Sequence, residues 1–498
     1  MMKGWPAMRI LYCTSEIAPY AKTGGLADVA SALPQALRRR GHDVRTVMPR
    51  YVHIGADERE LKRIVRRIGG DFFSRPYWGE VWETVMADGA TPVYFIAQPE
   101  LFERKELYGE DGRDYADNHL RFAYLCLAAL ELLKRLNWRP DAIICNDWQT
   151  ALIPVYLRNR AELRDDPFFQ SIKTLFVIHN IGYQGLCPRE AMREIRLPDD
   201  LFQPAGIEFY GRLNLLKGGM IYCDRIATVS EQHAREIQTE EYGFGLDGVL
   251  RERAELLSGI MNGIDGEEWN PADDELLPAH YNLKRLAGKA KCKRTLQQEC
   301  GLAVDAELPL IGMVTRLATQ KGLDLIEAAM ARLERLRCQW VILGSGDKLY
   351  EDLLAGMARR RPRQCYVRFG FDEQLAHRIF AGSDAFLIPS RYEPCGLTQF
   401  YAMRYGAVPV ARRTGGLADS IVQATEKAVA KGQGTGFLFN AHTPEAMLTA
   451  IRKALKVKTQ EPILWRAIQR NGMAQDFTWT ASAERYERLL QLLISRGA

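Results

Sequence analysis

A loop after the predicted strand Ala385–Ile388 combines a carboxylate with a glycine that opens a helix. Glu393 lies at the tip of this loop and can accept hydrogen bonds from sugar hydroxyls. The backbone amides of Gly396, Leu397 and Thr398 begin the helix and can hold a phosphate. In the structural alternative, Glu393 caps the helix and the cysteine that follows Pro394 packs in the core. A carboxylate one proline before a glycine-opened helix favours the binding role.

Two cations follow the predicted strand Leu310–Val314. Arg316 comes directly after this strand, and Lys321-Gly322 follows a short polar loop. Open α/β sheets bind ligands at the carboxyl ends of their parallel strands. A guanidinium and an ammonium at that edge suit a diphosphate, which needs both directed and point-charge partners. The alternative is an exposed loop that happens to carry two basic residues.

A glycine loop near the start of the chain could also cradle an anion. Lys22 precedes Gly24 and Gly25, and an apolar-periodic helix begins there. Free amides, the helix dipole and the Lys22 ammonium would together attract negative charge. Taken alone, a glycine turn beside a solvated lysine is the slightly better interpretation. Pro34 inside the helical pattern predicts a kink or an early end.

Polar residues follow two further predicted strands. Asp147 comes after the strand Ala142–Cys145, and His179 and Asn180 follow the strand Thr174–Ile178. A carboxylate, an imidazole and an amide at neighbouring strand ends form a polar floor suited to a hexose. For each residue taken alone, the better interpretation is an N-cap role for Asp147 and a structural role for His179.

Several chemistries lack their motifs. No His-Glu-x-x-His occurs, and no Cys and His residues stand at zinc-finger spacing. The sequence has no Gly-x-x-x-x-Gly-Lys-Ser/Thr loop and no Gly-x-Ser-x-Gly turn. Gly344-Ser345-Gly346 follows a strand as in a dinucleotide-binding motif, but Leu349 occupies the place of the third glycine. Hydride transfer is therefore a poor interpretation.

The elements that position these residues predict an α/β fold, because short β-branched runs alternate with helical patterns and continuous apolar runs indicate buried parallel strands. The predicted strands are Ile10–Cys13, Val44–Val47, Val93–Ala97, Ala142–Cys145, Thr174–Ile178, Ile226–Val229, Leu310–Val314, Trp340–Leu343, Tyr366–Phe369, Ala385–Ile388 and Val408–Ala411.

A short internal sequence repeat indicates two halves of similar architecture. Thr-Gly-Gly-Leu-Ala-Asp occurs at 23–28 and again at 414–419, each time before a helical pattern. The glycine-rich stretch Gly245–Gly266 predicts the linker or hinge between the halves. The polar segment Asp273–Lys293 predicts a surface excursion. The final segment Trp479–Ile494 is an amphipathic helix.

Composition narrows the class of protein further. The chain has 498 residues and a net charge of +5, which argues against a dedicated binder of nucleic acid. Ten cysteines without regular spacing predict reduced, buried thiols. The first eight residues do not form a signal peptide, and no apolar run is long enough to span a membrane. We therefore expect a soluble, cytoplasmic protein with no nucleic-acid or membrane partner.

The combination of motifs resembles the bacterial glycogen synthases over essentially the whole chain and in the same order. The motifs are Lys-Thr-Gly-Gly-Leu-Ala-Asp (22–28), Asn-Asp-Trp-Gln-Thr (146–150), Phe-Val-Ile-His-Asn (176–180), Met-Asn-Gly-Ile-Asp (261–265), Arg-Leu-x-x-Gln-Lys-Gly (316–322), Pro-Ser-Arg-Tyr-Glu-Pro-Cys-Gly-Leu-Thr-Gln (389–399), Thr-Gly-Gly-Leu (414–417) and Asp-Phe-Thr-Trp (476–479). The first glycine loop together with Glu-Pro-Cys-Gly-Leu-Thr is highly specific.

The resemblance implies two facing Rossmann-like domains of the GT-B glycosyltransferase type, with a substrate cleft between them. Residues 1–255 would form the acceptor-side domain, with 479–498 crossing back to it, and 256–478 the donor domain. The family's reaction transfers glucose from a nucleotide-glucose, usually ADP-glucose, to the non-reducing end of an α-1,4-glucan such as glycogen. It retains the anomeric configuration and needs no metal or other cofactor.

The resemblance also implies roles for individual residues. The catalytic set would be Lys22, Asp147, His179, Arg316, Lys321 and Glu393. The substrate-binding set would be Gly24, Gly25, Asp28, Tyr108, Asn180, Asn262, Cys395, Gly396, Leu397 and Thr398. One position departs from the pattern, because many family members have histidine where this chain has Asn146.

Three alternatives stay open at this point. UDP-glucose could replace ADP-glucose, or a related two-domain transferase such as a sucrose- or trehalose-type synthase could use another acceptor. A catalytically silent glucan-binding protein would not need Arg316, Lys321 and Glu393 together. A phosphorylase-like enzyme would need a lysine that anchors pyridoxal phosphate, and no residue is identified for that role. The sequence leaves the oligomeric state undefined.

Overall fold

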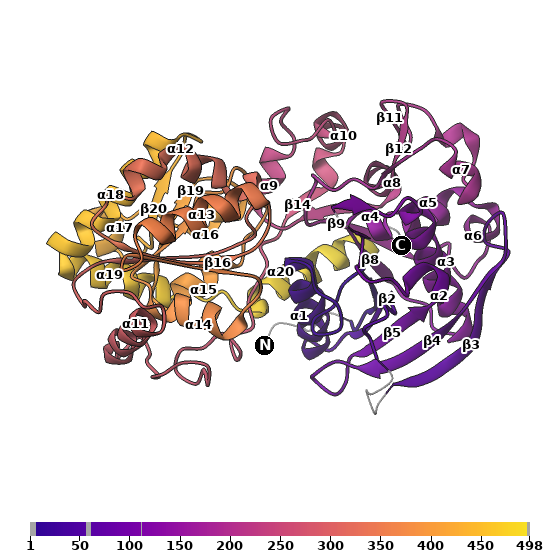
Figure 1. The fold of residues 1–498 in the computed structure, drawn as a ribbon. Coiled ribbons are helices and arrows are strands. Elements are labelled where there is room, and N and C mark those ends of the chain that lie inside the picture. Colours follow the sequence, from indigo (N-terminus) through magenta and orange to yellow (C-terminus); the bar gives the residue numbers. More distant parts are fainter. Residues whose placement is uncertain (1–5, 56–60, 111, 496–498) are drawn as a thin grey trace. The chain divides into compact units, whose positions relative to one another are not determined.

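The computed structural model describes residues 6–55, 61–110 and 112–495, and its chain forms two compact units (Figure 1). Unit 1 comprises Met1–Val229, Ala234–Met261 and Trp479–Ala498, and unit 2 comprises Ser230–His233 and Asn262–Thr478. The prediction about a signal peptide rests partly on residues 1–5, which lie outside the described residues. Among the described residues, no helix is both long and apolar enough to cross a membrane.

Unit 1 is built on a nine-stranded sheet with the order β14-β13-β9-β8-β1-β2-β5-β4-β3 in the described chain. Its strands are β1 (Arg9–Cys13), β2 (Asp43–Pro49), β3 (Lys62–Gly70), β4 (Tyr77–Val85), β5 (Pro92–Ala97), β8 (Ala142–Asn146), β9 (Lys173–Ile178), β13 (Arg225–Thr228) and β14 (Leu257–Gly259). All neighbouring pairs are parallel except β5 with β4 and β4 with β3. Short ribbons are formed by β6 (Gly109–Glu110) with β7 (Arg113–Asp114), and by β10 (Leu186–Cys187), β12 (Arg212–Asn214) and β11 (Glu208–Phe209).

Helices connect these strands. They are α1 (Gly25–Arg39), α2 (Pro99–Phe102), α3 (Asn118–Arg135), α4 (Asp147–Thr150), α5 (Leu152–Asn159), α6 (Ala161–Arg164), α7 (Ala191–Glu194), α8 (Leu215–Tyr222), α9 (Glu231–Glu236) and α10 (Asp247–Glu252), with 3₁₀ turns η1 (Asp199–Leu201) and η2 (Ala254–Leu256). Pro34 lies inside α1 and does not end it, so an early end at that proline is a wrong prediction.

Unit 2 contains a six-stranded, wholly parallel sheet with the order β17-β16-β15-β18-β19-β20. Its strands are β15 (Leu310–Val314), β16 (Gln339–Gly344), β17 (Cys365–Phe369), β18 (Ala385–Ile388), β19 (Val408–Arg412) and β20 (Phe437–Phe439). Its helices are α11 (Ala287–Glu299), α12 (Leu323–Leu333), α13 (Lys348–Arg360), α14 (Glu373–Gly382), α15 (Thr398–Arg404), α16 (Gly415–Ser420), α17 (Glu426–Ala430), α18 (Pro444–Gln460) and α19 (Pro462–Met473), with the turn η3 (Thr319–Lys321).

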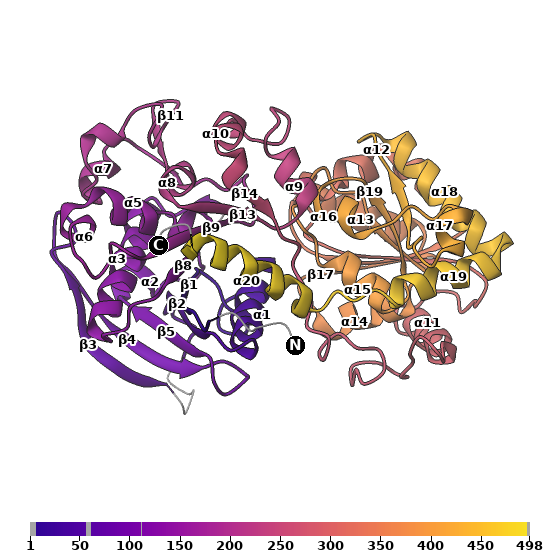
Figure 2. The ribbon, with the colours of Figure 1, turned by 180° about the vertical axis from the view of Figure 1, so that it is seen from behind.

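The final helix, α20 (Trp479–Ser495), belongs to unit 1 and packs against α1 (Figure 2). Its apolar face buries Tyr486 and Leu490. Glu487 of the same helix is also buried, and it accepts hydrogen bonds from the Arg40 guanidinium and lies 3.1 Å from His42 Nε2. An apolar stripe and a satisfied buried carboxylate together fix the helix on unit 1.

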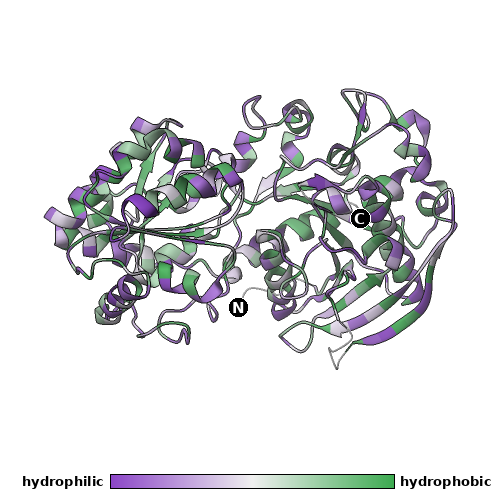
Figure 3. Cartoon of the chain, viewed as in Figure 1, coloured by the Kyte–Doolittle hydropathy of each residue, from purple (hydrophilic) through white to green (hydrophobic). Residues whose placement is uncertain are grey.

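All eleven predicted strands are present, each within two residues at either end. Their apolar runs are largely buried, except in the edge strand β17, whose last two residues are exposed. The hairpin β3–β4 was not predicted, since its strands carry many charged residues. Its pattern is amphipathic, and Figure 3 shows hydrophilic and hydrophobic residues alternating along it. On its exposed side the Arg67 guanidinium lies 3.6 Å from the centre of the Trp78 ring. Ionic and aromatic side chains therefore cover the polar face.

The segment Asp273–Lys293 is not the surface excursion that its polarity predicts. Asp274, Tyr281 and Lys289 are buried, and α11 begins at Ala287. Lys289 Nζ donates to the carbonyl oxygens of Ala381 and Tyr405, each at 2.9 Å. A buried polar group is tolerated when its hydrogen bonds are satisfied. All ten cysteines are buried and unpaired, as predicted.

Candidate functional site

The predicted site residues of unit 1 gather where β1, β8 and β9 end. These three parallel strands are neighbours in the sheet, so the segments after Cys13, Asn146 and Ile178 lie at one edge. We call this group the unit 1 cluster; it comprises Glu16, Lys22, Gly24, Gly25, Asp28, Tyr108, Asn146, Asp147, His179 and Asn180.

Asp147 holds the turn that follows β9. Its Oδ1 accepts hydrogen bonds from the backbone amides of His179 at 2.7 Å and of Asn180 at 3.4 Å. Asp147 has a backbone φ of +53°, a left-handed conformation that is uncommon for residues other than glycine. Burial raises the pKa of Asp147 to about 7, although the two amide hydrogen bonds act in the opposite direction. The carboxyl group therefore positions His179 and titrates near neutral pH.

His179 is held in one tautomer by Asn146. Asn146 Nδ2 donates to the carbonyl oxygen of Cys13 at 2.7 Å, so its Oδ1 accepts from Tyr12 at 3.1 Å and from His179 Nε2 at 2.8 Å. Burial lowers the pKa of His179 to about 3. The ring is consequently neutral, with the proton on Nε2 and a lone pair on Nδ1. Asn146 thus has a defined role at the position where the sequence departs from the family pattern.

The glycine loop is anchored by Glu16, a residue that the sequence analysis did not select. Glu16 is buried and accepts from the Thr23 amide at 2.6 Å, the Thr23 hydroxyl at 2.7 Å and the Tyr108 hydroxyl at 2.5 Å. Its position in the sequence could have marked it as a site residue, because Glu16 lies three residues after β1, at the same edge of the sheet as the other candidates. Lys22 Nζ lies 2.6 Å from Asp28 Oδ1, so the loop's cation is paired with an acid of α1.

In unit 2, a glycine brings two loops together. Gly322 has a φ of +78°, and a Cβ atom there would lie 2.2 Å from the carbonyl oxygen of Pro389. Only glycine fits this close approach. The Arg391 amide also donates to the carbonyl oxygen of Gln320 at 2.8 Å. The loop after β15 is therefore fixed against the loop after β18.

The contact between these two loops brings the Lys321 ammonium against the Glu393 carboxylate. Lys321 Nζ lies 2.8 Å from Glu393 Oε1 and 2.7 Å from Oε2, and the Ser390 hydroxyl donates to Oε2 at 2.8 Å. The side chains of Lys321 and Glu393 are only 18% and 8% exposed. A charge-assisted, largely buried pair holds both ionic groups in fixed positions before any ligand binds.

We call this pair together with the other predicted residues of unit 2 and Ser390 the unit 2 cluster; its members are Asn262, Arg316, Lys321, Ser390, Glu393, Cys395, Gly396, Leu397 and Thr398. Burial raises the pKa of the Cys395 thiol to about 12, so this residue packs and does not react. The amide of Asn262 bonds to Cys395, and Asn262 Oδ1 is buried without a hydrogen-bond partner among the described residues. Gly396 has a φ of +72° just before α15. Arg316 is exposed, and its guanidinium donates to Gln320 at 3.0 Å.

The two copies of the glycine motif have different surroundings. A Cβ atom on Gly24 would meet no atom within 4 Å. A Cβ atom on Gly415 would lie 1.9 Å from the carbonyl oxygen of Glu393, and one on Gly416 would lie 1.9 Å from that of Cys395. The second copy therefore packs against the Glu393 loop, whereas the first leaves space above its backbone for a ligand.

The predicted residues thus fall into two groups, one in each unit, and within each group they lie close together. Sequence reasoning missed Glu16 and Ser390, which hold predicted residues through short hydrogen bonds. Neither cluster holds a potential metal site: among residues 6–55, 61–110 and 112–495, the only group of His, Cys, Asp and Glu side chains with suitable spacing is Glu268, Glu373 and His377.

Two α/β units, each with parallel strands that end in polar loops, are the architecture of two-domain glycosyltransferases of the GT-B type, and matches to two family models assign the chain to that class. Residues 9–252 match the starch synthase catalytic domain family, and residues 300–471 match the family of glycosyl transferases group 1. The chain belongs to the glycogen and starch synthase family.

Relatives match the chain along nearly its whole length. It is 45% identical to the glycogen synthase of Geotalea daltonii, over 98% of this chain and 99% of that protein. It is 47% identical to the glycogen synthase of Anaeromyxobacter dehalogenans strain 2CP-1, with the same coverage of 98% and 99%. Among solved structures, it matches the catalytic domain of starch synthase IV from Arabidopsis thaliana, bound to ADP and acarbose, with a TM-score of 0.89 and 35% identity over 99% of this chain and 100% of that one.

Proposed function

We propose that the protein is a retaining glucosyltransferase that moves glucose from ADP-glucose to the non-reducing end of an α-1,4-glucan and releases ADP. Unit 2 binds the donor, and unit 1 supplies groups for the transferred sugar and the acceptor. The observation that carries the proposal is the Lys321–Glu393 pair, which offers a fixed cation and a fixed carboxylate at the ends of two adjacent strands.

Arg316 and Lys321 neutralise the diphosphate of the donor. Cleavage of the glucosyl–phosphate bond builds negative charge on the departing diphosphate, so fixed cations are worth more in the transition state than in the ground state. Lys321 is already oriented by Glu393, and little reorganisation is needed when the diphosphate arrives. The amides of Gly396, Leu397 and Thr398 add further donors for the distal phosphate.

Glu393 and Asn262 contact the glucose hydroxyls. The buried Oδ1 atom of Asn262 has no hydrogen-bond partner in the described chain, and such an atom is costly unless a ligand satisfies it. In unit 1, neutral His179 offers hydrogen-bonding atoms to a sugar without adding charge. Lys22, with the amides of Gly24 and Gly25, receives the anionic end of the substrate.

The transfer needs no covalent intermediate. The two candidate carboxylates are already engaged, because Asp147 accepts from two backbone amides and Glu393 bonds to Lys321 and Ser390. Retention then requires attack on the face that the diphosphate leaves. The leaving phosphate oxygen accepts the proton of the attacking glucan hydroxyl, so no protein base is required.

The choice of ADP-glucose is supported by the solved relative with ADP, which is 35% identical to this chain. UDP-glucose is the second candidate donor. Ten buried, unpaired thiols support a reducing compartment, and we place the reaction in the cytoplasm.

The test is nucleotide release by the purified protein, with glycogen as primer, ADP-glucose or UDP-glucose as donor, and EDTA present. The proposal predicts primer-dependent release of ADP that EDTA does not reduce. Release from UDP-glucose alone would overturn the donor, and release from neither donor would overturn the function.

A further inference from the structure

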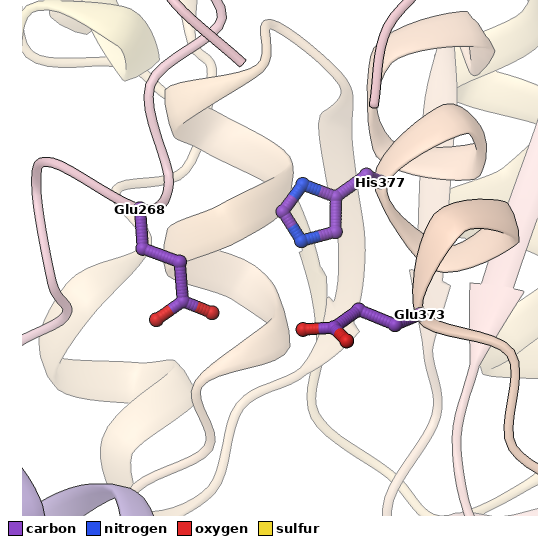
Figure 4. A group of neighbouring side chains, drawn as sticks. All are labelled: Glu268, Glu373 and His377. Atoms are coloured by element: carbon purple, nitrogen blue, oxygen red, sulfur yellow. The ribbon is translucent and has the colours of Figure 1, made fainter. Parts of the chain in front are cut away.

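A histidine and two glutamates of unit 2 gather outside both clusters described above. His377 and Glu373 lie on α14, one helical turn apart, and Glu268 lies in the loop that precedes α11 (Figure 4). One ligand atom of each side chain lies within 4.8 Å of the others. Figure 4 shows both carboxylates and one ring nitrogen of His377 directed toward a common space.

The two nitrogens of His377 have different environments. Nδ1 lies 2.7 Å from Asp274 Oδ2, a carboxylate oxygen that also accepts the Tyr405 hydroxyl at 2.6 Å. The ring is 98% buried, at 2% exposure, yet Nε2 has no hydrogen-bond partner among the described residues. Asp274 holds the Nδ1 side of the ring, so Nε2 is the nitrogen directed toward the two glutamates. A carboxylate behind the far nitrogen is the arrangement that orients histidine ligands of metals.

The ring cannot turn away from this space. Trp269 stacks on His377 with centroids 3.9 Å apart, and on Tyr401 of α15 with centroids 3.7 Å apart. Glu268 is the neighbour of Trp269 in the chain, so the stack also fixes the backbone that carries this carboxylate. Both glutamates are exposed. Without a cation, two carboxylates at this separation repel each other.

We propose that Glu268, Glu373 and His377 bind a divalent first-row transition cation, with Zn²⁺ as the representative ion. One imidazole and two carboxylates, with positions left open to water, match the nitrogen and oxygen donors that zinc accepts. Mg²⁺ and Ca²⁺ prefer oxygen donors alone and do not gain from the imidazole. Metal–ligand distances of about 2.0–2.2 Å require the carboxylates to move inward by roughly an ångström. The ion joins the loop at Glu268 to α14 and is separate from the proposed transfer chemistry.

The test uses the full-length protein, freed of metal and titrated with ZnCl₂ in a calorimeter. One Zn²⁺ per chain should bind. The variants Glu268→Gln and Glu373→Gln should each weaken binding at least tenfold, whereas Glu267→Gln, the same change at an exposed neighbour, should bind as the unsubstituted protein does. These side chains are exposed, so the variants should fold. CoCl₂ should give visible absorption bands of nitrogen and oxygen ligation, without the intense near-ultraviolet band of thiolates.

Three results would overturn the site. The first is the absence of stoichiometric Zn²⁺ binding. The second is equal affinity in the unsubstituted protein, Glu268→Gln and Glu373→Gln. The third is a thiolate spectrum with Co²⁺, which would assign the ion to cysteines. Binding of Mg²⁺ as tight as that of Zn²⁺ would also contradict the proposed donor set.

Discussion

Lys321 and Glu393 are 72 positions apart in the chain, yet both carboxylate oxygens of Glu393 lie within 2.8 Å of Lys321 Nζ. The resemblance to glycogen synthases assigns Lys321 to the diphosphate and Glu393 to the sugar. The structure places them in direct contact, so each residue orients the other. A donor that binds here inserts its diphosphate beside a cation whose direction is already set.

We predict that Lys321→Ala lowers kcat about a hundred- to a thousand-fold, or about 2.7–4 kcal/mol, the usual cost of losing one preorganised donor to a developing anion. Arg316→Ala should have an effect of the same size. The measurement is steady-state ADP release, with circular dichroism to verify folding. Lys348→Ala is the control, because Lys348 is also ion-paired but 79% exposed. Near-normal turnover of Lys321→Ala would remove it from the catalytic set.

Gly322→Ala should disrupt donor binding without touching any charged group. The new Cβ atom would lie 2.2 Å from the carbonyl oxygen of Pro389, so the two loops must separate. We expect KM for the donor to rise at least tenfold and the thermal midpoint to fall. Gly301→Ala is matched, since Gly301 has a φ of +65° with no atom within 4 Å of the added carbon. This control carries only the left-handed backbone cost of about 1–2 kcal/mol and should keep its activity. Equal KM values in both variants would contradict the role of the loop contact.

Asp147 should make the stability of unit 1 depend on pH. Its pKa is about 7 in the folded protein and near 3.8 in the unfolded chain, so the folded state binds more protons between these values. Stability therefore falls as pH rises from about 4 to 7 and is level above that range. Asp147→Asn removes this loss, and its thermal midpoint should exceed that of the unsubstituted protein by more at pH 8 than at pH 5. Exposed Asp200→Asn should show no such trend. A constant difference between pH 5 and pH 8 would show that Asp147 is ionised throughout.

Asn146 should control the orientation of His179. Asn146→Leu removes the acceptor for Nε2–H, and we predict that kcat falls about tenfold, the upper range for one lost hydrogen bond. Asn146→His supplies a new acceptor and should recover most of the activity. Because the pKa of His179 is about 3, Asn146→Leu should not introduce or remove an ionisation in the kcat profile between pH 5 and 8. Full activity of Asn146→Leu would show that the tautomer is unimportant.

The sequence predicted the strands and the polar residues that follow them, because both signals are local. A buried parallel strand reads as an apolar run, and Asp147, His179 and Arg316 come directly after such runs. The contacts between loops could not be predicted from the sequence. Nothing in the local pattern shows that Glu16 accepts three hydrogen bonds from residues at positions 23 and 108, or that Glu393 pairs with Lys321.

Buried polar segments were a second feature that could not be predicted from the sequence. The stretch around Asp274 and Lys289 has the composition of a surface loop, but tertiary contacts satisfy its charges inside unit 2. The β3–β4 hairpin was not predicted for a related reason. Its many charged residues mask the alternation of polar and apolar positions along the strands, and an aromatic ring packs against the Arg67 guanidinium. At Asp274 and Lys289 the environment of the side chain, not its type, decides burial.

The most direct test of the central claim follows labelled glucose from ADP-glucose into glycogen and then digests the product with β-amylase, which cuts α-1,4 bonds from the non-reducing end. The account predicts primer-dependent incorporation, with nearly all label released by the digestion as maltose. Label that resists digestion, or label released by the protein as free glucose, would contradict glucosyl transfer with retention to the non-reducing end.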